Sequence, residues 1–156
     1  MENNFILKSI MEAFDLNKVD VLKSYKLIDK KVTQEDVDDI LTDKNDEKFI
    51  LLSDEGLELF LNGFIVYKRG PSDKKGKLQK VELSNNLILK KLKIAYNLKD
   101  EDLIEIFAND GLEITKSQLT AYFRREGHQN YRKCSDALLK RFLKGCKIYT
   151  KRETNE

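Results

Sequence analysis

The chain has 156 residues, 40% of them hydrophobic and 36% charged, and its 29 Lys and Arg against 27 Asp and Glu give a net charge of +2. An apolar share this large with so small a net charge excludes intrinsic disorder for most of the chain. No apolar run reaches the roughly 18 residues of a membrane span, and the first residues, Met1 to Asn4, are acidic where a signal peptide is basic. We therefore expect a globular cytoplasmic protein that does not enter a membrane.

The chain contains an internal repeat. The segment NNFILK at residues 3–8 returns as NNLILK at residues 85–90, an offset of 82, and this offset holds without a gap to Gly70 against Arg152. The sequence therefore predicts an acidic repeat one over residues 1–70, a basic linker over 71–84, a basic repeat two over 85–152 and a disordered tail over 153–156.

In chain order, the first helix of each repeat is expected to open at an Asn-Asn pair, at Asn3 or Asn4 and at Asn85 or Asn86, because asparagine is a favoured N-cap. The apolar residues that follow have the i, i+4, i+7, i+8 spacing of one helical face. The second helices are expected over about 18–28 and 100–110. Gly111 can adopt the left-handed conformation that ends the latter.

The third and fourth helices of each repeat have recognisable caps. Thr33 and Thr115 are expected to cap the third helices, and Ser53 and Ser135 the fourth. Apolar residues in the fourth helices recur at i, i+3, i+4 and i+7, which predicts one buried face. Between the repeats, we expect extended chain over residues 78–83.

Gly63 and Gly145 fall inside the fourth helices, where glycine costs about 1 kcal/mol relative to alanine. We infer that another helix crosses closely at each of them. The predicted fold is all-α: two tandem homologous repeats of about four helices each, packed with pseudo-twofold symmetry, because one repeat alone would bury a marginal core.

No motif predicts a metal or cofactor site. Asp43-x-Asn45-x-Glu47 resembles a calcium loop in outline, but Lys48 stands where the loop needs glycine and Asp54 replaces the bidentate glutamate. We interpret this segment as a solvated acidic loop. The chain's one histidine and one nearby cysteine are too few ligands for a zinc site.

Cys134 and His128 could still form a nucleophilic pair, since Cys134 sits just before a predicted helix N-terminus. Leu52 occupies the equivalent position in repeat one, which favours a buried structural thiol. An enzyme is therefore the least favoured hypothesis, and we predict no catalytic residue.

The two repeats differ in charge. Residues 3–70 carry 10 basic and 14 acidic side chains, a net charge of −4, while residues 85–152 carry 15 and 8, a net charge of +7. On the third helix of repeat two, the face opposite the predicted core is small and polar and ends in a basic residue. Its members are Ser117, Thr120, Ala121 and Arg124; the same face of repeat one presents Glu35, Asp38, Asp39 and Thr42.

The second and third helices of repeat two, joined by a turn from Gly111 to Thr115, resemble a helix-turn-helix. The basic and aromatic residues after them could meet phosphates and stack on a base. We therefore hypothesise a non-enzymatic protein that binds DNA or RNA. The candidate contact residues, which would serve equally for a protein partner, are Ser117, Thr120, Arg124, Arg125, His128, Asn130, Tyr131, Arg132 and Lys133.

A protein-interaction or self-associating adaptor module is the alternative. The acidic face of repeat one would then meet the basic face of repeat two in a homodimer or a partner complex, and this complementarity would set orientation and association rate.

Several longer motifs resemble the YehS-like family, a bacterial family of unknown function built of two such repeats. They are the Asn-Asn-x-Ile-Leu-Lys opening of each half, FLNGFI at residues 60–65, FRREGHQNY at 123–131 and FLKG at 142–145. The resemblance covers about residues 3–145 and implies a cytoplasmic bacterial protein. It brings no activity, cofactor or catalytic residue, so it assigns no role to any position of this chain.

Overall fold

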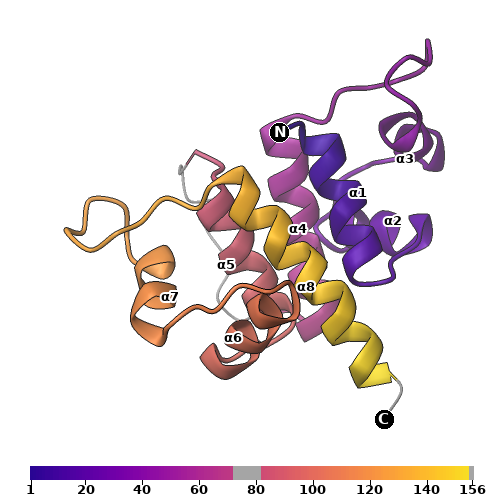
Figure 1. Ribbon diagram of the computed structural model, residues 1–156. Coiled ribbons are helices and arrows are strands. Elements are labelled where there is room, and N and C mark those ends of the chain that lie inside the picture. The colour runs from indigo at the N-terminus through magenta and orange to yellow at the C-terminus, as the bar shows by residue number, and fades with distance from the viewer. Residues whose placement is uncertain (72–81, 155–156) are drawn as a thin grey trace.

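The computed structural model describes residues 1–71 and 82–154, and within these ranges the regular structure is entirely helical (Figure 1). The expected all-α fold of two four-helix repeats is confirmed. The helices are α1 (Asn3–Ala13), α2 (Lys18–Leu27), α3 (Gln34–Leu41), α4 (Asp54–Arg69), α5 (Asn85–Ala95), α6 (Asp100–Asn109), α7 (Lys116–Phe123) and α8 (Asp136–Thr154).

The segment between the repeats and the end of the chain are described only in part. Most of the expected linker, residues 72–81, lies outside the described residues, as does most of the stretch expected to be extended. At the C-terminus, α8 continues through Thr154. The expected tail is therefore corrected for residues 153 and 154, which are helical, while residues 155 and 156 lie outside the described residues.

Four of the predicted caps are confirmed by side-chain hydrogen bonds. Thr33 and Thr115 accept from the N–H groups at the third position of α3 and α7, each within a reciprocal capping box. Ser53 accepts from the N–H of Gly56 at 3.0 Å, and Ser135 from that of Leu138 at 3.1 Å. These bonds satisfy backbone donors that a helix leaves unpaired at its start.

The Asn-Asn pairs are not the caps of α1 and α5, which corrects the prediction. Glu2 and Ser84 occupy the cap positions, and the Ser84 hydroxyl accepts from the N–H of Leu87. The pairs lie one and two residues inside each helix, where their side chains turn toward another part of the chain.

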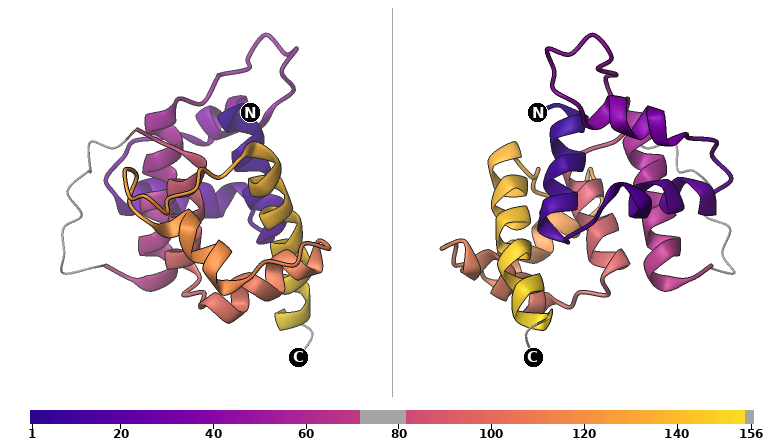
Figure 2. Two further views of the ribbon diagram at one scale, coloured as in Figure 1. Left: turned by 60° about the vertical axis from the view of Figure 1, so that its left-hand side comes forward. Right: turned by 90° about the vertical axis from the view of Figure 1, so that its right-hand side faces the viewer.

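The two repeats interlock around a central bundle of α1, α4, α5 and α8 (Figures 1 and 2). Helix α1 of repeat one packs mainly on α8 of repeat two, and α5 packs mainly on α4. Phe14 and Tyr96, which the 82-residue offset relates, stack with ring centroids 4.1 Å apart. A pseudo-twofold axis therefore passes between these rings, and one hydrophobic core serves both repeats.

The close crossings inferred at Gly63 and Gly145 are confirmed. Helix α2 crosses α4 so closely that a Cβ at Gly63 would overlap the backbone carbonyl of Ser24. A Cβ at Gly145 would overlap the carbonyl of Ile106 where α6 crosses α8. Glycine is thus required because backbone, which cannot move aside as a side chain does, fills the space.

We predict that Gly145→Leu destabilises the fold by about 3 kcal/mol, because the added side chain must push α6 away from α8. Thermal unfolding followed by circular dichroism should then show a midpoint lower by about 6–12 °C. Ala137→Leu, at an exposed position on the same helix, is the matched control and should leave the midpoint nearly unchanged. Equal midpoints for the two variants would contradict the crossing geometry.

Candidate functional site

Seven of the nine candidate residues lie on the loop between α7 and α8, which projects from one end of the molecule (Figure 1), and the other two, Ser117 and Thr120, lie on α7. We call residues 124–133 the basic loop and residues 42–51, between α3 and α4, the acidic loop. The 82-residue offset relates the two segments, and they project in different directions. The molecule therefore carries two versions of one loop.

A buried carboxamide holds the basic loop against the bundle. The side chain of Asn86, only 8% exposed, donates to the carbonyls of Tyr122 at 3.0 Å and Arg132 at 2.8 Å, and accepts from the N–H of Cys134 at 2.9 Å. Asn85 adds a bond from its amide to the Cys134 carbonyl. Both ends of the loop are thus fixed to the start of α5.

Asn4 makes the same three bonds in repeat one. Its side chain donates to the carbonyls of Ile40 and Ile50 and accepts from the N–H of Leu52, each at 2.8 Å. Sequence reasoning missed this role because it assigned the pair to capping. The repetition of the pair 82 residues apart, each time in the first turn of a helix, was the available signal.

The interior of the basic loop is a hydrogen-bonded turn. The N–H of His128 donates to the carbonyl of Arg125, and the N–H of Tyr131 to that of His128. Gly127, at φ 97°, has a left-handed conformation that glycine adopts without strain. The N–H of Arg132 then donates to the carbonyl of Ala121 on α7 at 3.0 Å, so the loop has one preferred shape.

His128 has a structural role within this turn. Its Nδ1 accepts from the N–H of Asn130 at 3.0 Å, as a carboxylate oxygen of Asp46 accepts from the N–H of Lys48 in the acidic loop. A neutral imidazole that accepts at Nδ1 carries its proton on Nε2. The Arg124 guanidinium, 3.4 Å from Nε2, is also a donor, so these two groups pack together without a hydrogen bond.

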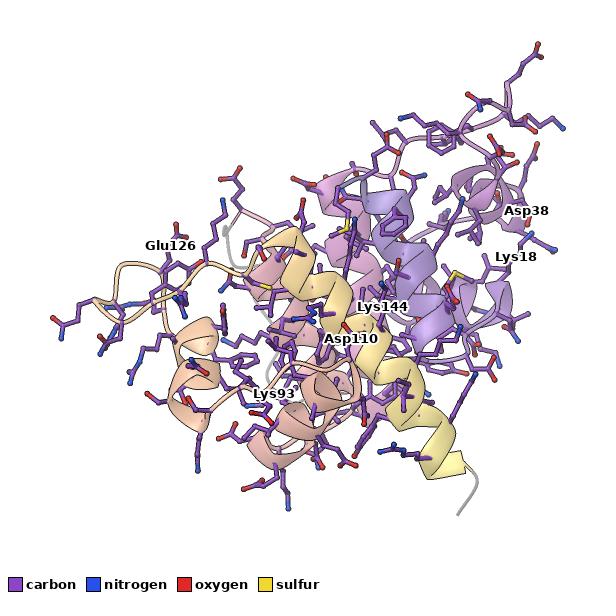
Figure 3. All side chains as sticks on the ribbon, in the orientation of Figure 1. Lys18, Asp38, Lys93, Asp110, Glu126 and Lys144 are labelled. Atoms are coloured by element: carbon purple, nitrogen blue, oxygen red, sulfur yellow. The ribbon has the colours of Figure 1, made fainter. Side chains whose placement is uncertain are left out.

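Arginine and lysine side chains supply the positive charge of the loop. Arg124, Arg125, Arg132 and Lys133 are all exposed, and none forms an ion pair with another described residue. Glu126 is the one acid among residues 124–133, and it lies on the projecting loop (Figure 3). The loop therefore offers cations that no ion pair within the described residues neutralises.

The remaining candidate residues differ in how accessible their side chains are to a ligand. Ser117 is exposed on α7, whereas the Thr120 hydroxyl donates back to the Lys116 carbonyl at 2.8 Å and is used within the helix. Tyr131 is half-buried; burial and, to a smaller extent, the carboxylate of Glu126 raise the pKa of its phenol. Tyr131 is therefore neutral at physiological pH and keeps part of its ring accessible.

The geometry of α6 and α7 differs from that of a typical helix-turn-helix. The connection between α6 and α7 runs from Asp110 to Thr115, longer than the three or four residues typical of the motif. Helix α7 has only 8 residues. The basic loop, rather than α7, is the part of this surface that projects furthest (Figure 1).

Cys134 is buried, and its thiol bonds to the carbonyl of Ser135. Burial, with a smaller effect from the nearby Asp136 carboxylate, raises the pKa of the Cys134 thiol to about 12. No hydrogen bond joins it to His128 within the described chain. The arrangement suits a structural thiol rather than a nucleophile, which needs a lowered pKa.

Two carboxylates of the acidic loop accept hydrogen bonds from backbone N–H groups of the same loop. Asp43 accepts from the N–H of Asn45, and Asp46 from that of Lys48, both at 2.8 Å.

Over residues 1–71 and 82–154, no group of three or more His, Cys, Asp and Glu side chains is placed to hold a metal ion. Over the same residues, no helix is both long and apolar enough to span a bilayer.

Comparisons with known proteins place the chain among uncharacterised relatives. Residues 3–70 and 85–152 each match the family model described as "Protein of unknown function (DUF1456)". The chain is 33% identical over 146 residues to the uncharacterized protein YehS of Escherichia coli (strain K12), covering 93% of this chain and 94% of that protein. No solved structure gives a significant match.

We predict that Asn86→Ala releases the basic loop, because it leaves two carbonyls and one N–H without their partner. The substitution should lower the free energy of unfolding by about 2–4 kcal/mol. In hydrogen exchange, the amide of Cys134 should lose protection. Asn85→Ala, which removes no bond to that amide, is the matched control and should leave its exchange nearly unchanged. Unchanged Cys134 protection in Asn86→Ala would contradict the tether.

We predict that Cys134 resists alkylation in the folded protein. Because burial raises the pKa of the Cys134 thiol to about 12, very little thiolate is present at pH 8. Iodoacetamide followed by mass spectrometry should show modification only after denaturation. A folded-state rate at or above that of a free thiol would revive the enzyme hypothesis.

Proposed function

The chain belongs to the DUF1456 family, whose description assigns no activity, and from its own residues we propose that it binds nucleic acid through the basic loop. The proposal is of a cytoplasmic binding protein rather than an enzyme. It requires no cofactor, since the contacts come from side chains alone.

The observation that carries the proposal is the set of four unpaired cations on one hydrogen-bonded loop. Arg124, Arg125, Arg132 and Lys133 lie within ten residues and are exposed. Cations that form no ion pair with another described residue are available to neutralise phosphates, and binding then gains from the release of condensed counterions. The Asn86 tether limits the loop entropy that binding would cost.

The chemistry of the loop favours contacts to the backbone of the nucleic acid. Guanidinium groups pair with phosphate oxygens through two hydrogen bonds, and such contacts carry no sequence information. Tyr131 and Asn130 add a partly accessible ring and an amide, which suit stacking and hydrogen bonding to an unpaired base. We therefore expect binding that tolerates many sequences and prefers single-stranded or looped segments.

The acidic loop provides the internal comparison. Ile50 and Leu51, 43% and 64% exposed, occupy the positions of Arg132 and Lys133. The equivalent backbone hydrogen bonds and the same asparagine tether are present there, although Asn45 lacks the positive φ of its counterpart Gly127. The acidic loop therefore lacks two of the cations that the basic loop offers to phosphate.

The rival proposal joins the acidic face of α3 to the basic face of repeat two. Acids of that face are partly engaged within the chain: Asp38 pairs with Lys18 at 2.7 Å, and both side chains lie at the junction of α2 and α3 (Figure 3). The cations of the basic loop have no such partner among residues 1–71 and 82–154. Because the acids are partly engaged and the cations are not, we favour a ligand from outside the chain. Phosphate is the group that best matches these cations.

We predict that Arg132→Ile/Lys133→Leu, which gives the basic loop the residues of the acidic loop, weakens nucleic-acid binding about tenfold or more. The slope of log affinity against log salt should also fall by up to about 2 units, since two phosphate contacts are lost. Fluorescence polarisation with a labelled duplex DNA and a hairpin RNA measures both quantities.

Lys44→Ala/Lys48→Ala, on the acidic loop, is the matched control for charge and should bind as the unmodified protein does. Absence of binding by the unmodified protein at tens of micromolar in low salt would overturn the proposal, as would equal losses in both variants.

A further inference from the structure

Helices α2 and α6 occupy equivalent places in the two repeats, yet the segments around them have opposite charge. Residues 18–31 carry five Lys and two Asp, a net charge of +3. Residues 100–113 carry six Asp and Glu and no Lys or Arg, a net charge of −6. The net charge of each segment is thus opposite in sign to the net charge of the repeat that contains it.

The outer face of α2 carries exposed lysines beside apolar side chains. Helix α2 buries Val21, Ser24 and Tyr25 against the bundle. Its opposite face borders an open groove of about 570 Å³, in which Val19 is 53% exposed. Four lysines at the groove have no ion pair with another described residue: Lys23, Lys26, Lys30 and Lys31.

The outer face of α6 has the complementary chemistry at the same positions. Glu101 and Glu105 replace Val19 and Lys23, and both glutamates are exposed. The ion pair of Glu105 is a loose one, 3.8 Å from the exposed side chain of Arg152. The positions of Leu22 and Lys26 are taken by two residues that keep the face partly apolar: Ile104 and Ala108.

We propose that the protein self-associates head to tail, with the α2 face of one copy docking on the α6 face of the next. The lysines of one face would meet Glu101 and Glu105 of the other around an apolar centre. A second copy is the occupant because the chain itself presents the matching charge and apolar pattern. The basic loop takes no part, so the inference does not rest on the proposed function.

The placement of the faces sets the kind of assembly. Helices α2 and α6 lie on opposite sides of the central bundle in Figure 1 and in the right-hand view of Figure 2. A contact between two different surfaces on opposite sides is heterologous, so it builds a ring or an open filament rather than a simple twofold dimer. Single-helix faces are small compared with stable interfaces of about 1,600 Å², so the association should be weak and sensitive to salt.

The test uses two charge-reversed variants and their mixture. Lys23→Glu/Lys26→Glu reverses two charges of the α2 face, and Glu101→Lys/Glu105→Lys reverses the two glutamates of the α6 face. Sedimentation velocity from about 10 μM to 1 mM should show species larger than a monomer for the unmodified protein at low salt. These species should disappear in about 1 M salt and in each variant alone, and return when the two variants are mixed.

Arg124→Glu/Arg125→Glu is the matched control, since it reverses charge outside both faces, and it should assemble like the unmodified protein. Circular dichroism should confirm that all variants are folded. A monomeric unmodified protein at the highest concentration would overturn the proposal, as would mixed variants that remain monomeric. Unchanged assembly of Lys23→Glu/Lys26→Glu with lost nucleic-acid binding would instead assign the groove to phosphate and overturn it too.

Discussion

Two buried carboxamides, those of Asn4 and Asn86, hold the acidic loop and the basic loop in place. Each makes three hydrogen bonds to backbone groups at the two ends of a loop that the bundle would otherwise leave free. Buried backbone groups that lose such partners cost about 1–3 kcal/mol each, so the loops keep one position relative to the core. The side chains between the tethers can therefore vary without loss of the fold.

Duplication and divergence explain the distribution of charge. The positions that pack or tether are nearly the same in both repeats, as the stack of Phe14 on Tyr96 and the glycines at both helix crossings show. The exposed positions differ: the basic loop carries Arg132 and Lys133 where the acidic loop carries apolar residues. A nearly neutral chain thus has regions of strong and opposite charge.

Much of this fold follows from local sequence signals. Threonine and serine caps, helical spacing and glycine in mid-helix depend on neighbours within a few residues, and Thr33, Thr115 and Gly63 behave as predicted. The pairing of α1 with α8 could not be predicted, because an apolar face does not specify which helix covers it. The asparagines were misassigned for a related reason, since capping and tethering use the same side chain and only the tertiary structure decides between them.

We propose that the basic loop, and not its acidic counterpart, contacts nucleic acid on a preformed scaffold. Backbone amide chemical shifts of ¹⁵N-labelled protein, followed during titration with a hairpin RNA at low salt, test it directly. We predict shifts confined to residues 124–133 and their tether at Asn86, with residues 42–51 unchanged. Equal shifts in the two loops, or shifts in neither, would contradict the account.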